Sequence, residues 1–246
     1  MSAAAGGGAR MKLAQILFSQ GFGTRRACEG LVLGGYVAID GAVHDDPFEE
    51  LAPAGLVLNV EGRDWPVHLR ALVALNKPAG YECSKKPRHH ASVYSLLPAP
   101  LLRRDVQAVG RLDEDTTGLL LFTDDGQLLH RWTSPKHHVP KVYDVSCRHP
   151  VTDEQLARLR AGVVLQDDPA PVGALAADPW DGADPGLHGL RLTLAEGRYH
   201  QVKRMMAAVG NRVERLHRSR FGALALPPQL APGQWCWLAG PEVVAG

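Results

Sequence analysis

The residues best suited to chemistry lie in a glycine-bounded stretch at positions 110–119, Gly-Arg-Leu-Asp-Glu-Asp-Thr-Thr-Gly-Leu. It places Asp113 and Asp115 on a loop directly before an apolar run, and catalytic residues concentrate on loops held by rigid elements. In one interpretation Asp113 is a nucleophile or base, kept ionised by cations such as Arg111. Two alternatives stay open: a calcium loop starting at Asp113, which lacks the usual Glu at its twelfth position, and a merely solvated turn.

A second candidate stretch, residues 196–205, reads Glu-Gly-Arg-Tyr-His-Gln-Val-Lys-Arg-Met. Its spacing predicts a helix over 200–209, on which His200, Lys203 and Arg204 share one face. A basic helix beside the acidic loop would pair Lys203 with Asp113 and favour the ionised carboxylate. The alternative is a phosphate-binding or solvated face without catalysis.

Several other kinds of site find no support in the sequence. It contains no glycine-rich dinucleotide or nucleoside triphosphate loop and no serine nucleophile elbow. The adjacent histidine pairs lack metal-ligand spacing, and the four cysteines at positions 28, 83, 147 and 236 form no CxxC motif. We therefore expect no metal, no cofactor and reduced thiols in a cytoplasmic protein. No apolar run approaches the ~18 residues that a membrane span requires.

The elements that must position these residues begin with a pattern of two helices and a hairpin. Apolar residues at helical spacing from Leu13 stop at Gly21, and Thr24 is a candidate N-cap for a second helix that ends at residues 34–35. Strands are expected at 37–39, 42–43 and 56–60, with an Asp-Gly turn between the first two. Residues 61–70 are expected to form a linker, and the ten residues before Met11 a disordered tail.

After residue 70 the pattern becomes mixed α and β. Strands are expected at 71–75, 119–123, 142–146 and 187–194, and helices at 126–132 and 200–209. Thr152 and Gln155 have the spacing of a capping box for a further helix. This interleaving of strands and short helices predicts an α+β domain.

Charge is segregated along a chain whose net charge is only +1. Residues 191–220 contain eight basic and two acidic residues, a local net charge of +6. Such a segment is typical of a surface that binds a polyanion. Arg25 and Arg26 fall in the first turn of the second expected helix, where cations oppose the helix dipole unless a phosphate sits there. A solvated helix face is the alternative for these two arginines.

Five motifs in order, read together, resemble one known family. They are residues 76–81 (Asn-Lys-Pro-Ala-Gly-Tyr), 110–119, 133–138 (Thr-Ser-Pro-Lys-His-His), 141–143 (Lys-Val-Tyr) and 196–205. Over about residues 11–240 the chain resembles the RsuA family of pseudouridine synthases. The resemblance implies an S4-like RNA-binding domain at 11–65 followed by a pseudouridine synthase domain at 71–246, with a mixed, mainly antiparallel sheet.

The resemblance also implies the reaction and its catalytic residues. A uridine is isomerised by breaking the C1′–N1 glycosidic bond and joining C1′ to C5, which requires no cofactor. Asp113 matches the essential aspartate, as base or nucleophile, Tyr143 the tyrosine that stacks on the flipped uracil, and Lys203 the basic partner of the aspartate. Residues expected to bind RNA are Arg25, Arg26, Arg111, Arg131, Lys136, Lys141, Arg198, His200, Arg204, Arg215 and Arg218.

We therefore expect a monomeric rRNA pseudouridine synthase that acts on ribosomal RNA or an assembling subunit. Small-subunit 16S rRNA is the expected target, since the match is closest to the 16S-modifying members, and 23S rRNA is the alternative within the family. Two further hypotheses are a non-catalytic assembly protein that binds rRNA and a glycoside hydrolase that uses Asp113 and Asp115.

Overall fold

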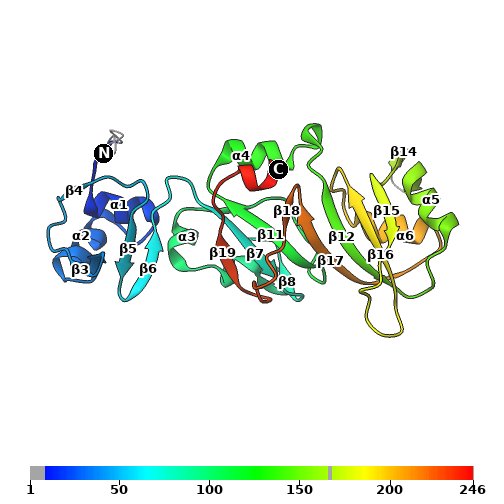
Figure 1. Cartoon of the computed structure of the whole chain (residues 1–246), viewed down its shortest axis with the longest axis horizontal. Helices are drawn as coiled ribbons and strands as arrows, with labels where there is room; N and C mark the ends of the chain where they lie inside the picture. The colour runs from blue at the N-terminus through cyan, green and yellow to red at the C-terminus, as the bar shows by residue number, and fades with distance from the viewer. Residues whose placement is uncertain (1–8, 166–167, 246) are drawn as a thin grey trace, which may run out of the picture. The chain divides into compact units, whose positions relative to one another are not determined.

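The computed structural model describes residues 9–165 and 168–245, and the chain divides into two compact units (Figure 1). The N-terminal unit contains the chain up to Ala71 together with Leu97–Val106. The C-terminal unit contains Leu72–Leu96 and the chain from Gln107 onward. Residues 1–8 of the expected tail lie outside the described residues.

The N-terminal unit contains the two helices and the hairpin that the sequence predicts. Thr24 caps the second helix, because its side-chain oxygen accepts a hydrogen bond from the backbone N–H of Ala27 at 3.2 Å. The apolar faces of the two helices and of the small sheet form one core around Leu17 and Leu58. The elements are β1 (Met11–Lys12), α1 (Leu13–Gln20), α2 (Arg25–Leu33), β2 (Val37–Ile39), β3 (Ala42–Val43), β4 (Glu50–Leu51), β5 (Val57–Val60), β6 (Arg63–Pro66) and α3 (Ala99–Arg103).

Two details of this unit differ from the sequence-based prediction. Residues 61–70 are not simply a linker, because β6 pairs antiparallel with β5 and buries the indole of Trp65. Leu97–Val106, which the sequence assigns to the catalytic domain, belongs to the N-terminal unit. Arg104 shows the reason, since its guanidinium donates hydrogen bonds to Gln20 Oε1 at 2.9 Å and to the carbonyl of His68 at 2.8 Å. These contacts join residues distant in sequence, so no local pattern signals them.

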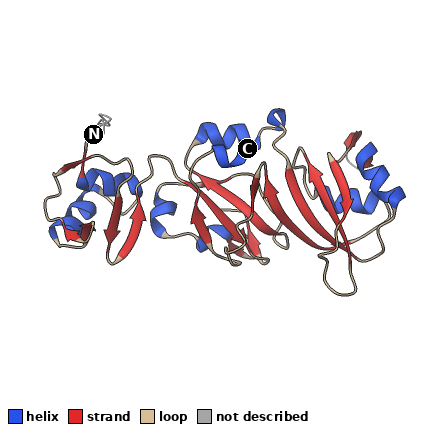
Figure 2. Ribbon diagram, in the orientation of Figure 1, coloured by secondary structure: helices blue, strands red, loops and turns tan. Residues whose placement is uncertain are grey.

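The C-terminal unit is built on a nine-stranded sheet with the order β15-β16-β12-β17-β11-β7-β19, to which β10 and β18 add (Figure 2). Only β11 and β17 pair in parallel among these described strands. The α+β class with a mainly antiparallel sheet is therefore confirmed.

The bounds of these elements complete the description of the unit. Its strands are β7 (Leu72–Lys77), β8 (Tyr81–Glu82), β9 (Ala91–Ser92), β10 (Gln107–Ala108), β11 (Thr117–Thr123), β12 (Lys141–Cys147), β13 (Val163–Leu165), β14 (Asp168–Val172), β15 (Ala176–Pro179), β16 (His188–Leu194), β17 (Val213–Phe221), β18 (Leu224–Ala225) and β19 (Trp235–Trp237). Its helices are η1 (Val93–Leu96), α4 (Gly126–Thr133), η2 (Pro135–His137), α5 (Asp153–Ala161), α6 (Gln201–Ala208) and α7 (Glu242–Ala245).

The parallel pair β11–β17 fixes the position of the candidate catalytic loop. Gly118 has φ +103° and packs so closely on β17 that a Cβ there would lie 2.4 Å from the carbonyl oxygen of Arg218. Only glycine fits this contact. One side of β11 packs through Leu119 and Leu121 into the core that contains Trp132 of α4. The loop that precedes β11 is therefore attached to the rigid centre of the sheet. None of the helices in the described residues is long and apolar enough to cross a membrane.

Candidate active site

The loop that carries Asp113 joins β10 to β11 and is closed by a turn in which the N–H of Thr116 donates to the carbonyl of Asp113 at 3.1 Å. Gly110, with φ +74°, starts the loop. The N–H of Gly80, in the turn after β7, donates to the carbonyl of Glu114 at 2.9 Å. The acidic residues therefore lie on an ordered backbone next to the ends of β7 and β11.

Lys77, at the end of β7, binds the backbone of the same loop. Its side chain is fully buried, and its ammonium donates to the carbonyl oxygens of Pro78 (3.1 Å), Glu114 (3.0 Å) and Thr116 (2.8 Å). Burial lowers the pKa of Lys77, while the thiol of Cys83 and the carboxylates of the loop act in the opposite direction. The sequence analysis included Lys77 in the motif at 76–81 but gave it no role. Its signal was a charged residue at the end of a mostly apolar strand.

Asp113 lies between two basic groups contributed by the start of α6. Its Oδ1 is 3.4 Å from His200 Nε2, and its Oδ2 is 3.5 Å from Lys203 Nζ. The carboxylate is 28% exposed, so it lies in a partly enclosed position rather than in bulk water. A carboxylate placed beside basic groups in this way can serve as a base or as a nucleophile.

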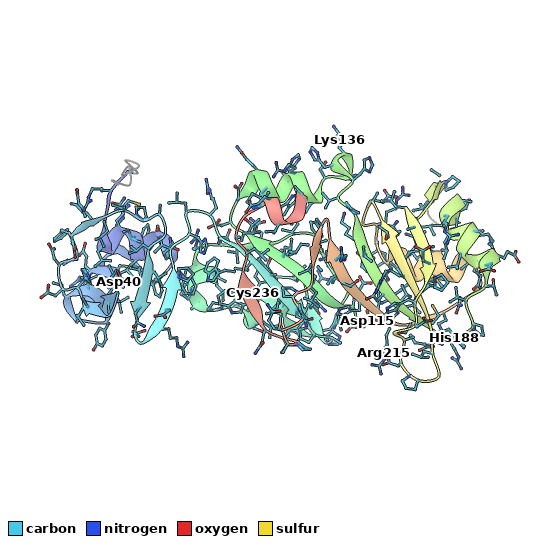
Figure 3. All side chains as sticks on the ribbon, in the orientation of Figure 1. Asp40, Asp115, Lys136, His188, Arg215 and Cys236 are labelled. Carbon is cyan, nitrogen blue, oxygen red and sulfur yellow. The ribbon has the colours of Figure 1, made fainter. Side chains whose placement is uncertain are left out.

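Asp115 is the nearer partner of Lys203, which the sequence analysis paired with Asp113. Lys203 Nζ lies 2.7 Å from Oδ1 and 2.8 Å from Oδ2 of Asp115. Burial alone lowers the pKa of Lys203, but the hydrogen bond and charge of Asp115, with those of Asp113, raise it above its ordinary value. The lysine is therefore a cation shared by two carboxylates. Figure 3 shows Asp115 and Arg215 at the same end of the sheet.

An aromatic residue absent from the sequence-based candidates lies beside this cluster. The ring of Tyr199 stacks on His200 with a centroid separation of 3.9 Å and an interplanar angle of 18°. Tyr199 is 77% exposed. His200 itself has φ +47° and precedes the first residue of α6, so it is the N-cap rather than part of the helix as predicted. Exposed aromatic rings are platforms on which nucleic-acid bases stack.

Tyr143 lies in β12 with two cations on neighbouring positions. The register places it opposite Arg218 of β17, and Lys141 opposite Phe221, with an irregularity between Val142 and Tyr143. Tyr143 is buried, at 7% exposure. Lys141 Nζ lies 5.5 Å from the centre of the Phe221 ring. Burial first, and then the charge of Arg218, lowers the pKa of Lys141 to about 8, against the opposing effect of Glu196.

Arg218 is not a surface cation, although the sequence analysis placed it among the residues that hold RNA. It is only 2% exposed, and its Nε donates to the carbonyl of Leu119 at 2.7 Å. Its guanidinium carbon lies 5.5 Å from the Phe221 ring. Leu216 and Arg218 are both buried, whereas Arg220, two positions further along β17, is exposed, because the pairing of β17 with β12 is irregular between these two arginines.

The other predicted RNA-binding residues are distributed over both units. Arg25 and Arg26 are exposed in the first turn of α2, and Arg25 lies over the Phe18 ring at 5.0 Å. Arg111, Arg131 and Lys136 are exposed, but Lys136 lies at the opposite end of the sheet from Asp115 (Figure 3). The remaining three are Arg198, which pairs with Glu196 at 3.1 Å, Arg215, which pairs with Asp184 at 2.7 Å, and Arg204, which donates to the carbonyl of Tyr199 at 3.3 Å.

Comparison with known proteins assigns this arrangement to a family. A family model described as RNA pseudouridylate synthase matches residues 71–208, more than half of the chain. This chain belongs to the RNA pseudouridylate synthase family. The matched range contains the positions of Asp113, Tyr143 and Lys203, and the family named from the sequence motifs is confirmed.

Individual relatives of this synthase agree over nearly its whole length. Ribosomal small subunit pseudouridine synthase A of Salmonella typhimurium is 40% identical over 241 residues, which cover 96% of this chain and 99% of that protein. An uncharacterized RNA pseudouridine synthase of Bacillus subtilis is 37% identical over 235 residues, which cover 95% and 97%. A crystal structure of a pseudouridylate synthase superposes with a TM-score of 0.65 at 32% identity, covering 95% of this chain and 98% of that one.

Proposed function

We propose that this synthase isomerises a specific uridine of ribosomal RNA to pseudouridine, with small-subunit 16S rRNA as its target. The observation that carries the proposal is the carboxylate of Asp113, held between Lys203 at 3.5 Å and His200 at 3.4 Å on an anchored loop. The name of the Salmonella relative supports the small-subunit target. The Salmonella relative is bacterial, and bacteria make and assemble ribosomal RNA in the cytoplasm, so we propose that the enzyme acts there. We also propose that it is a monomer.

The chemistry requires one carboxylate and no external reactant. Asp113 either removes a proton from C2′ or attacks C1′, and the C1′–N1 bond breaks with its electron pair remaining on the uracil. The uracil rotates and C5 bonds to C1′. On the first route Asp113 returns its proton to C2′ in this step, and on the second route the bond between Asp113 and C1′ breaks. The proton on C5 is then lost and N1 gains one, so the product is an isomer of the substrate and the carboxylate of Asp113 is restored. Lys203 and His200 lie close enough to hold the carboxylate of Asp113 in position for this sequence of steps.

The target uridine has to leave its stack, because its uracil must rotate before C5 bonds to C1′ and a stacked base cannot turn. We assign Tyr143 to stacking against the extruded uracil, and the basic residues around the site to the displaced backbone. The N-terminal unit is proposed as an S4-like RNA-binding domain. Its support is the arrangement of two helices and a hairpin, with Arg25 and Arg26 exposed at the start of α2.

The test compares two carboxylate deletions on one loop. Asp113→Asn is expected to bind 16S rRNA but to release no tritium from RNA that contains 5-³H-uridine. Asp115→Asn is the matched control, because it removes an equal charge from the same loop while it leaves Asp113 in place, and it is expected to form product. Normal turnover by Asp113→Asn, or loss of turnover only in Asp115→Asn, would contradict the assignment.

The target molecule requires a separate experiment. Pseudouridine is mapped in 16S and 23S rRNA from cells with and without the protein. Loss of one 16S pseudouridine is expected, and loss confined to 23S rRNA would reassign the substrate. RNA binding without any change in pseudouridine content would instead support a non-catalytic assembly protein.

A further inference from the structure

The segment between β8 and β9 carries a group of basic side chains that neither the sequence analysis nor the proposed function uses. The sequence contains no Asp or Glu between Glu82 and Asp105. We call residues 83–91 the basic loop. Its basic side chains fall within six residues and are all exposed: Lys85, Lys86, Arg88, His89 and His90.

The backbone of the basic loop is held in one conformation by Glu82. Its carboxylate accepts hydrogen bonds from the N–H groups of Arg88 (3.1 Å), His89 (2.8 Å) and His90 (2.9 Å). These three bonds lower the pKa of Glu82 to about 2. The hydroxyl of Ser92 also donates to the carbonyl of Ser84 at 2.5 Å across the base of the loop. The backbone of the loop is thus ordered before any ligand binds, so binding loses less conformational entropy.

The basic loop is attached directly to the loop that carries Asp113. The N–H of Leu112 donates to Cys83 Sγ at 3.4 Å. His90 Nε2 lies 4.0 Å from the carboxylate of Glu114. Both ends of the basic loop therefore touch residues directly adjacent to Asp113, and Arg111 is exposed beside them. Glu82 and Glu114 are the acidic groups in contact with the loop, and the charge of Glu82 is directed at backbone N–H groups.

We propose that the basic loop binds the phosphate backbone of the RNA strand that carries the target uridine. The inference rests on the proposed function, because extrusion of a nucleotide toward Asp113 brings the phosphates next to it over the rim of the site. Exposed lysine and arginine side chains on an ordered loop match such a backbone, since they neutralise phosphates and release counterions without reading the sequence.

The first test removes the charge of the loop. The triple variant K85Q/K86Q/R88Q is compared with K85R/K86R/R88K, which keeps every charge and the side-chain lengths nearly unchanged. Binding of a 16S rRNA transcript is measured from 50 to 200 mM salt. Loss of three phosphate contacts lowers the slope of log K against log [salt] by about 2, so the wild type loses about 20-fold more affinity over this range than the variant. The charge-keeping variant is expected to follow the wild type.

The second test separates an ordered loop from a general effect of charge. Glu82→Ala removes a negative charge from the protein, so a non-specific electrostatic effect would tighten RNA binding. Loss of the three hydrogen bonds to the loop backbone predicts the opposite, a weaker complex and a higher KM. Thermal unfolding of the variant is followed in parallel, and Glu82→Gln, which keeps one carbonyl acceptor, is expected to fall between Glu82→Ala and the wild type.

The outcomes distinguish this inference from the function on which it rests. A wild-type protein that forms no pseudouridine overturns the proposed function, whatever the salt slopes. A wild type that forms pseudouridine, beside a triple variant with unchanged slope and unchanged KM, overturns the role of the basic loop alone. Tighter binding by Glu82→Ala overturns the ordered-loop argument. If the triple variant still binds RNA but no longer binds an acidic protein that the wild type binds, the basic loop serves a protein partner, and the inference is also overturned.

Discussion

Replacing Lys203 by methionine is expected to slow the reaction at Asp113 without removing its carboxylate. Lys203 is shared by Asp113 and Asp115. Its removal leaves two carboxylates that contacted the same ammonium, with His200 as the remaining basic neighbour of Asp113 among the described ion pairs. The proposed catalytic carboxylate then loses the cation that holds it in place and offsets its repulsion from Asp115.

The size of the effect follows from the 3.5 Å separation of Lys203 Nζ and Asp113 Oδ2. Coulomb's law gives about 1.2 kcal/mol at the dielectric constant of water and about 4.7 kcal/mol at an effective value of 20. Both side chains are 28% exposed, and measured ion pairs at exposed sites contribute about 0.2–1 kcal/mol. A value of about 1.5 kcal/mol is reasonable for this position, which corresponds to about a tenfold change in rate.

The assay is the rate of single-turnover pseudouridine formation at saturating RNA. The rate of Lys203→Met is expected to be about tenfold lower than that of the wild type. Arg204→Met is the matched control. It removes a cation from the next position of α6, and its expected effect is on KM rather than on the single-turnover rate. An unchanged single-turnover rate in Lys203→Met, or equal losses in the two variants, would refute the argument.

Two other lysines lead to further predictions. Lys77→Met leaves the buried carbonyl of Thr116 without its hydrogen-bond donor, but it also removes a buried charge. With both effects included, we expect the free energy of unfolding to fall by about 3 kcal/mol. Urea denaturation measures this change, and a decrease of less than about 0.5 kcal/mol would contradict the prediction. Lys141, whose pKa is lowered to about 8, loses its charge as pH rises from 7 to 9. RNA affinity of the wild type should then fall over this range, and that of Lys141→Arg should stay level. Because the unfolded chain keeps this proton up to its higher ordinary pKa, the free energy of unfolding contributed by Lys141 rises with pH above about 8. Equal pH profiles for the two proteins would exclude Lys141 as the responsible group.

Much of the local structure could be predicted because its signals are local. Thr24 caps its helix, and Thr152 and Gln155 form the expected capping box. Each of these contacts joins residues three positions apart, so spacing alone identifies them. The segment at 61–70 was mispredicted because Trp65 and its neighbours look like a linker until β5 supplies the partner strand.

In the candidate site, too, local patterns could be predicted, whereas contacts between distant residues could not. The proximity of Asp113 and Lys203 could be predicted, because a glycine-bounded acidic loop and a basic helix are unusual patterns that also match family motifs. The sharing of Lys203 with Asp115 could not, since a difference of 0.8 Å between its two carboxylate distances depends on how α6 meets the loop. Nor could the stacking of Tyr199 on His200, which arises from the left-handed conformation at the N-cap.

The sequence by itself determined the reaction class, because five short motifs in order match those of one family. Only the tertiary structure decided which charges are buried and which reach solvent. Lys77 and Arg218 look like surface cations in the sequence, yet each is buried against backbone carbonyls contributed by β11 or the loop before it. Lys85 and Lys86 look no different and are exposed. The distinction rests on strand pairing between residues as many as 99 positions apart, and a charge is stable inside a protein only where such distant partners meet it.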